Sequence, residues 1–315
     1  MVDDVTAGLD DWLFLTGGSN SVISYFTDPN HFSPEHVRLW VELMRSRAEK
    51  AAALGIRYQH IAPPEKLSVY PEFFPEPLQI ADGAPGRVLA GALAREPAEH
   101  WWRHVFIDLL PYFDLQKQFN HKLYFKTDTH WTFEGAFAAY QLLCHHLNAE
   151  ADTGLLSRPS SDADLVLDLG GKFDPPIVER FSMRDVLKTA IRINVNDLVR
   201  YKEEQNAENQ VGLHIGSAVV FRNDSPTADP RRLVLFGDSF SEYRPHMLTG
   251  LLAETFAEVH FVWSSQVDWG YVERVAPHIL ITELAERFMT YVPNDEGFDL
   301  QAYVSEKLAA ATAET

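Results

Sequence analysis

Short predicted strands alternate with amphipathic segments along most of the chain. Strands are predicted at residues 12–15, 57–61, 105–109, 233–236, 259–262 and 278–281, and most of these are continuous apolar runs. Helices are predicted at residues 34–54, 87–95, 136–147, 246–256, 267–275 and 300–311. Apolar strands separated by helices are typical of a mostly parallel sheet that is covered on both faces, so the pattern predicts an α/β fold.

Residues from about 150 to 230 depart from this alternation. The stretch contains several prolines, and its β-like runs at residues 191–195 and 217–221 predict a small antiparallel element. The chain has no internal repeat and no low-complexity tract. We therefore predict a single domain over residues 1–315 with a small, irregular, β-containing insert at about 150–230.

Composition and charge limit the classes of function. The chain has 315 residues, 46% of them hydrophobic, which is enough for one large core or two modest ones. The net charge is −18, with scattered acidic residues and no Lys/Arg cluster, so we expect no nucleic-acid partner. The charge also disfavours anionic membranes and polymers unless a local basic groove exists. The single cysteine, Cys144, excludes an intrachain disulfide and a Cys-rich zinc site.

The start of the chain shows no export signal. Met1-Val2-Asp3-Asp4-Val5 has neither a basic region nor an apolar region of the kind that begins a signal peptide. No stretch approaches the roughly 20 apolar residues of a membrane span. The expected location is the cytoplasm, and a longer natural start would change it to the periplasm.

Two short motifs carry the candidate chemistry. Asp128-Thr129-His130-Trp131 precedes a predicted helix, and Gly237-Asp238-Ser239-Phe240-Ser241 directly follows a predicted strand. Together they supply the carboxylate, imidazole and hydroxyl that activate a serine nucleophile. We predict Ser239 as the nucleophile, His130 as its base and Asp128 as the group that orients the base. Catalytic groups collect at the carboxyl ends of parallel strands, and the helix after Ser239 can direct its amides at an oxyanion.

Each motif has a simpler interpretation. A Gly-Asp-Ser string occurs by chance, and Asp128 can cap the helix that follows. A metal site formed by His121, Asp128, His130 and the pair His145-His146 is a weaker alternative, because adjacent residues of a helix face different directions. We therefore predict no metal.

Further residues are candidates for the oxyanion hole or for substrate binding. Gly237, Ser264 and Tyr271 lie at or after predicted strand ends, and Trp131 can shield the Asp128–His130 pair from water. Lys66 and Arg287 are charged and sit near probable strand ends, where a salt bridge is the commoner role.

Around these residues the chain resembles the SGNH hydrolase-like alginate O-acetyltransferases, the AlgX- and AlgJ-like family. The resemblance covers most of the chain and is carried by residues 11–15, 63–70, 123–131, 237–240 and 286–287. The serine block comes after the Asp-His block, the reverse of the order in ordinary SGNH esterases, and this permuted order is that of the family. The resemblance implies a flavodoxin-like, three-layer α/β sandwich, a Ser-His-Asp triad and acetyl transfer to or from sugar hydroxyls.

The sequence and the resemblance together predict serine-dependent acetyl transfer on a carbohydrate through an acyl-Ser239 intermediate. The activity is either that of a polysaccharide O-acetyltransferase or that of an O-acetylesterase. We expect the reaction to need no metal or organic cofactor. A second protein is a candidate source of the acyl donor. Alginate itself is not carried over, because a polyanion is an awkward match for a charge of −18. The alternatives are a non-catalytic glycan-binding or assembly partner and a lipase or thioesterase acting on other esters.

Overall fold

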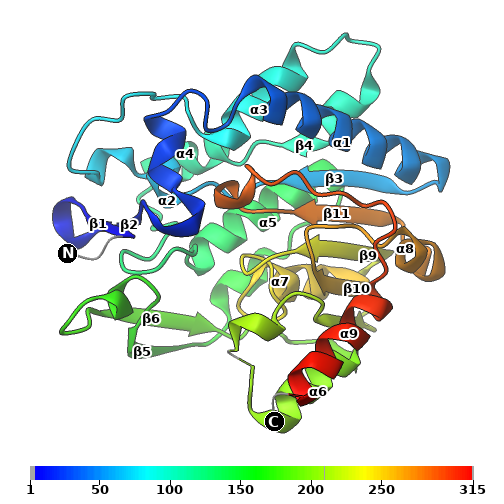
Figure 1. Cartoon of the computed structure of the whole chain (residues 1–315). Helices are drawn as coiled ribbons and strands as arrows, with labels where there is room; N and C mark the ends of the chain where they lie inside the picture. Colours follow the sequence, from blue (N-terminus) through cyan, green and yellow to red (C-terminus); the bar gives the residue numbers. More distant parts are fainter. Residues whose placement is uncertain (1–3, 209, 314–315) are drawn as a thin grey trace. The chain divides into compact units, whose positions relative to one another are not determined.

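The main sheet of the computed structural model, which describes residues 4–208 and 210–313, is shown in Figure 1. Six of its strands follow one another in the order β3 (Arg57–Ile61), β11 (Ile279–Glu283), β9 (Asp229–Gly237), β10 (Phe256–Trp263), β8 (Ala218–Asn223) and β7 (Ala190–Val195). β9 pairs in parallel with β10 and β11, whereas β8 and β7 extend the sheet in antiparallel pairing. The predicted α/β class with a mostly parallel central sheet is confirmed.

Internal contacts divide the chain into two units. Unit 1 comprises residues 1–46, 61–185 and 284–292, and unit 2 comprises residues 47–60, 186–283 and 293–315. The chain passes from one unit to the other within α1 (Pro34–Ala53) and at the last residue of β3. Asp128 and His130 therefore belong to unit 1, and Ser239 belongs to unit 2.

Unit 1 is built from short helices and two separate ribbons of antiparallel strands. Its helices are α2 (Lys66–Val69), α3 (Pro85–Ala94), α4 (Leu110–Gln118) and α5 (Phe133–Leu147), besides most of α1. Its strands are β1 (Val5–Ala7), β2 (Leu13–Leu15), β4 (Phe106–Ile107), β5 (Ser160–Val166) and β6 (Val178–Arg184). β1 pairs with β2, β5 pairs with β6, and α2 packs on β2 and α4. This packing brings α2 beside the first ribbon.

Unit 2 holds the six strands and the helices α6 (Asp197–Gln205), α7 (Leu248–Thr255), α8 (Trp269–Val275) and α9 (Leu300–Ala313). α7 packs on β10 and β8, and α6 packs on β8 and α9. The four residues 233–236 of β9 have no exposed surface. A strand covered on both faces needs apolar side chains at every position, which is why this run shows no polar alternation.

The six predicted helices and six predicted main strands are present, with small changes of boundary. The structure differs from the prediction between residues 150 and 230. The predicted runs 191–195 and 217–221 do pair antiparallel, but as β7 and β8 they continue the main sheet, because β8 is an almost fully buried apolar strand. The separate small element is the β5–β6 ribbon, whose side chains are mostly exposed and whose sequence lacks a clear apolar pattern.

The structure describes only part of the segment in which an export signal was sought. Residues 1–3, which begin the segment searched for an export signal, lie outside the described residues. Across residues 4–208 and 210–313, no helix combines the length and the apolar character that crossing a bilayer requires.

Candidate active site

Hydrogen bonds between the flanking residues hold the two ends of the Asp128–His130 loop of unit 1 together. An isolated antiparallel bridge joins Tyr124 to Trp131, and the Thr132 amide donates to the Leu123 carbonyl at 2.8 Å. Thr132 then caps α5, its hydroxyl accepting from the Gly135 amide at 3.2 Å. The simpler interpretation, in which Asp128 is the cap, is therefore wrong, because Thr132 takes that position.

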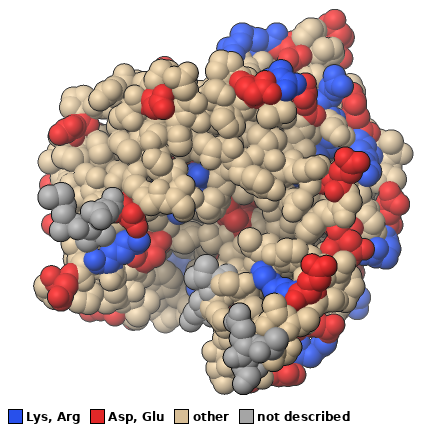
Figure 2. All heavy atoms as spheres, viewed as in Figure 1, with Lys and Arg blue, Asp and Glu red and all other residues tan. Residues whose placement is uncertain are grey.

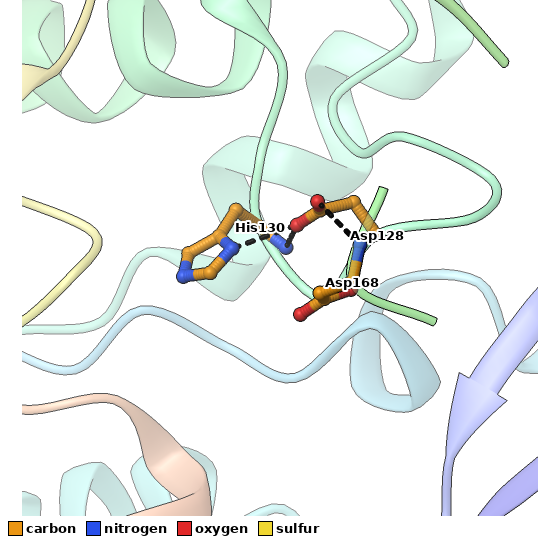
Figure 3. A group of neighbouring side chains, drawn as sticks. All are labelled: Asp128, His130 and Asp168. Carbon is orange, nitrogen blue, oxygen red and sulfur yellow. Dashed lines mark hydrogen bonds and ion pairs between the residues drawn. The ribbon is translucent and has the colours of Figure 1, made fainter. Parts of the chain in front are cut away.

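Asp128 and His130 form a directly hydrogen-bonded pair (Figure 3). Nδ1 of His130 lies 2.7 Å from Oδ1 of Asp128, and the main-chain amide of His130 donates to the same oxygen at 2.8 Å. The side chains keep 28% and 14% of their surface exposed, respectively. An ionised carboxylate only accepts hydrogen bonds, so we assign the ring proton to Nδ1, which leaves Nε2 as the basic nitrogen.

Asp128 and His130 each stabilise the charged form of the other. Burial alone would raise the pKa of Asp128, but the hydrogen bond and charge of His130 outweigh it and lower that pKa to about 2. Burial alone would lower the pKa of His130, but the hydrogen bond and charge of Asp128 raise it above its ordinary value. Such a histidine is a stronger base than a free imidazole, as a proton acceptor for serine needs to be.

Asp168 completes this group, and the sequence did not single it out. Its carboxylate accepts hydrogen bonds from the main-chain amide of Thr129, at 2.8 Å, and from the Thr129 hydroxyl. Its own amide points to Oδ2 of Asp128 at 3.3 Å. Figure 3 shows it approaching from a separate segment of the chain. Asp168 lies 37 residues after the end of the motif, with no local pattern around it, so only the fold reveals the contact.

The same three residues are near enough to share a metal ion. One ligand atom from each of Asp128, His130 and Asp168 lies within 4.8 Å of the others. Among residues 4–208 and 210–313, this is the group of His, Cys, Asp or Glu side chains that could hold a metal ion. His121, His145 and His146 are not part of it. The oxygens of both carboxylates already accept N–H or O–H groups, so the donor set fits a hydrogen-bonded orienting pair better than a metal centre.

Lys66 and Arg287, which were candidates for substrate binding from the sequence, both contact the main chain of the loop. Nζ of Lys66 donates to the carbonyls of residues 125, 126 and 128, at 3.0, 2.8 and 2.6 Å. Nη2 of Arg287 donates to the Thr129 carbonyl at 3.2 Å, and its Nε donates to buried Glu65 at 2.5 Å. The structure therefore gives both cations a supporting place rather than a substrate-binding one.

In unit 2, Ser239 sits half-buried on a tight turn directly after β9. The amides of Phe240 and Ser241 donate back to Asp238, at 2.9 Å to its carboxylate and 3.2 Å to its carbonyl. The expected helix start is not adjacent, because α7 begins only at Leu248. A turn closed by Asp238, rather than a helix N-terminus, thus holds the serine.

Glu283, at the end of β11, accepts a hydrogen bond from the main chain of this turn. Its Oε2 accepts the Asp238 amide at 2.9 Å, and a β-carbon at Gly237 would lie 2.7 Å from that oxygen. The side chain is almost fully buried, and burial together with the charge of Asp238 holds the pKa of Glu283 well above its usual range. Glycine is therefore required at 237 by the close approach of a buried carboxyl group.

The other predicted substrate-binding residues take structural places. The Ser264 amide donates to the Gly237 carbonyl at 3.1 Å, tying the ends of β10 and β9 together. The Tyr271 hydroxyl lies 2.7 Å from Nδ1 of buried His260. Trp131 is 2% exposed, and its ring centroid lies 6.5 Å from that of Phe113 in unit 1.

The face drawn in Figure 2 carries mixed charge. Lys and Arg atoms lie there among Asp and Glu atoms and form no continuous basic band on that face.

Comparisons with known proteins place these features in a family. A family model described as SGNH hydrolase-like domain, acetyltransferase AlgX, matches residues 5–168, which include Asp128, His130 and Asp168. No curated protein matches the chain.

Solved structures share the fold at low sequence identity. The O-acetyltransferase domain of Pseudomonas putida AlgJ is 18% identical with a TM-score of 0.60, over 97% of this chain and 99% of that one. Bacillus cereus PatB1 with a sulfonyl adduct is 13% identical with a TM-score of 0.57, over 91% and 98%. Pseudomonas aeruginosa AlgX is 18% identical with a TM-score of 0.51, over 93% and 66%.

Proposed function

We propose, from the premise that the chain belongs to the SGNH hydrolase-like family of the acetyltransferase AlgX, that it acetylates carbohydrate hydroxyls through an acyl-Ser239 intermediate. Ser239 is the nucleophile in this proposal, His130 the general base and Asp128 the group that orients it. The observation that carries the proposal is the 2.7 Å bond between Nδ1 of His130 and Oδ1 of Asp128. It fixes the tautomer whose Nε2 can take a proton from a hydroxyl.

The reaction has two balanced steps. Oγ of Ser239 attacks the carbonyl carbon of an acetyl ester while its proton passes to Nε2 of His130. The bond to the donor alcohol breaks, and His130 returns the proton to that alcohol. An acceptor hydroxyl then attacks the acetyl-Ser239 ester, and its proton passes through His130 to Oγ as the ester bond breaks.

The acceptor decides between the two predicted activities. A sugar hydroxyl yields an acetylated sugar, and water yields acetate, so the outcome depends on how well the site excludes water. We favour sugar as acceptor because the family is one of acetyltransferases and the similar AlgJ domain is named an O-acetyltransferase. The proposed substrate is a carbohydrate of unspecified sequence.

The decisive experiment follows acetyl transfer from 4-nitrophenyl acetate. We expect wild type to release nitrophenol and to carry a 42 Da acetyl mass on the Ser239 peptide, roughly one acetyl per chain at saturation. Ser239→Ala should lose both signals, and the control Ser225→Ala, from the loop between β8 and β9, should keep both. Adding a neutral oligosaccharide should divert acetyl from acetate to sugar.

The result that would reject the proposal is equally concrete. Equal activity in wild type and Ser239→Ala, with no labelling of wild type by a sulfonyl fluoride, would remove the serine nucleophile. The protein would then be better described as a binding partner with the same fold.

A further inference from the structure

Lys66 is a buried cation that the proposed reaction does not use. It lies in α2, and only 2% of its surface is exposed. Its Nζ has hydrogen bonds to three main-chain carbonyls of one loop, those of Phe125, Lys126 and Asp128, at 3.0, 2.8 and 2.6 Å. Two of these carbonyls precede Asp128 and one belongs to it, so a single side chain binds the loop at three residues.

The geometry leaves this ammonium no donor for a substrate. An ammonium group has three N–H bonds, and Lys66 has three carbonyl acceptors within hydrogen-bond range. The aromatic rings of Trp12 and Phe14 are also near it, with centroids 5.7 and 5.9 Å from Nζ. A neutral amine has one N–H fewer, so the three bonds together require the charged form.

Burial and the neighbouring carboxylates act in opposite directions on the charge of Lys66. Burial is the larger effect and lowers the pKa of Lys66 to about 7, although the carboxylates of Asp168, Asp128, Glu179 and Glu65 raise it. These four carboxylates come from the loop itself, from the segments packed against it and from the residue before α2. The three bonds to main-chain carbonyls, rather than the surrounding charge, are therefore the support for the ammonium form.

The loop needs such a partner because its backbone leaves regular structure. Phe125, Thr127 and Thr129 are buried, so their carbonyls need hydrogen-bond donors within the protein. The Lys126 carbonyl accepts the Leu13 amide as well as Lys66, and the Thr127 carbonyl accepts the amides of Leu169 and Gly170. Lys66 is the donor at the carbonyls of Phe125 and Asp128, and Arg287 is the donor at the carbonyl of Thr129.

We propose that Lys66 is a positioning residue, which holds the Asp128–His130 loop in its working geometry through three main-chain carbonyls. It touches neither substrate nor the reacting atoms. Its effect on rate rests on the function proposed above, whereas its effect on the loop does not.

Lys126 is the matched control for this inference. It is a lysine of the same loop, it lies near the same Trp12 ring at 6.0 Å, and its Nζ donates to the Asp10 carbonyl outside the loop. Lys126→Met therefore removes an equal charge from the same neighbourhood without releasing a carbonyl of residues 125–129.

The first measurement is hydrogen exchange of the peptide spanning residues 123–133 in wild type, Lys66→Met and Lys126→Met. We expect exchange at the amides of Thr129 and His130 to be about tenfold faster in Lys66→Met and unchanged in the control. Equal protection in all three proteins would overturn the inference. This readout needs no substrate, so it stands even if no acyl-transfer activity is found.

The second measurement separates positioning from mere stabilisation. With active protein counted by sulfonyl fluoride titration, we expect kcat per folded Lys66→Met molecule to fall about 10²-fold and KM to stay within about twofold. A lower melting temperature with unchanged kcat per folded molecule would show a structural role only, and would overturn the inference.

A third measurement uses the unaltered protein and covers the case in which Lys66→Met does not fold. In ¹⁵N NMR of the wild type we expect a lysine ammonium signal that is protected from exchange with water, in addition to that of buried Lys202, and that is absent from Lys66→Arg. If Lys66→Arg removes no protected ammonium signal, the inference is wrong.

Discussion

Asp128→Asn is the substitution whose outcome depends most directly on the geometry of the loop. Oδ1 of Asp128 accepts two N–H groups of His130, and Oδ2 faces the Asp168 amide at 3.3 Å. Asparagine keeps the shape but turns one of these oxygens into a donor. If its NH₂ faces Asp168, two donors meet; if it faces His130, the ring adopts the wrong tautomer.

The magnitude follows from the pKa of the carboxyl group. A fall from 3.8 to about 2 means that the folded loop favours ionised Asp128 by about 2 kcal/mol. The interaction belongs to the pair, so it is counted once and it also accounts for the raised pKa of His130. This stabilisation is present above the ordinary carboxyl pKa and is lost as pH falls through about 2. Asparagine removes it at every pH.

The assay is the pH dependence of kcat/KM for hydrolysis of a small acetyl ester. His130 must be neutral to act as base, and its pKa is raised, so the wild-type rate should fall at acid pH with a midpoint above 6.5. In Asp128→Asn the largest raising contribution disappears, while burial and the smaller raising effect of Asp168 remain, so the midpoint should move to lower pH. The plateau rate should drop about 10³–10⁴-fold.

The control is Asp162→Asn, which changes a carboxylate of β5 whose side chain is 44% exposed. It should leave both plateau and midpoint unchanged. If Asp128→Asn retained the wild-type plateau and midpoint, the Asp128–His130 bond would have no part in the reaction, and the reasoning from tautomer and pKa would fail.

Two substitutions in unit 2 test its packing. Gly237→Ala would place a β-carbon 2.7 Å from Oε2 of Glu283, so we expect a loss of about 1–3 kcal/mol in urea unfolding and a lower kcat; unchanged stability would show that the carboxyl group moves freely. Arg47→Met leaves Asp295 without the partner that it holds at 2.7 Å, so we expect thermal and urea unfolding to report a loss of about 3–5 kcal/mol, and a loss under about 1 kcal/mol would contradict the burial argument.

The fold was predictable where one physical cause dominates. Strands such as residues 233–236 are buried on both faces, so burial alone dictates their composition and the apolar run reveals them. The β5–β6 ribbon was missed because its side chains are mostly exposed and its pairing comes from the backbone. α4 was missed because its apolar start, Leu110, continues the run that ends at Leu109 and reads as one strand.

The site was predictable where the chemistry is local. Asp128 and His130 are two residues apart, so their side chains are neighbours in any extended loop, and the structure confirms the contact at 2.7 Å. Asp168 and Lys66 act through hydrogen bonds between a side chain and a distant main-chain group. Almost every residue carries the main-chain group that such a bond uses, so the sequence does not show which segment the side chain contacts. The triad with Ser239 stays a prediction that the labelling experiment tests.

The charged residues around the loop explain how a short irregular segment can present a reactive histidine. A regular strand or helix satisfies its own peptide groups, but a loop must find partners elsewhere. Here Lys66 and Arg287 bind carbonyls, while Asp168 and Glu179 bind the amides of Thr129 and Thr127. Since these partners are in place without substrate, altering one of them should lower kcat and leave KM unchanged. A residue that binds the sugar directly would instead alter KM, and that difference separates the two kinds of residue by kinetics alone.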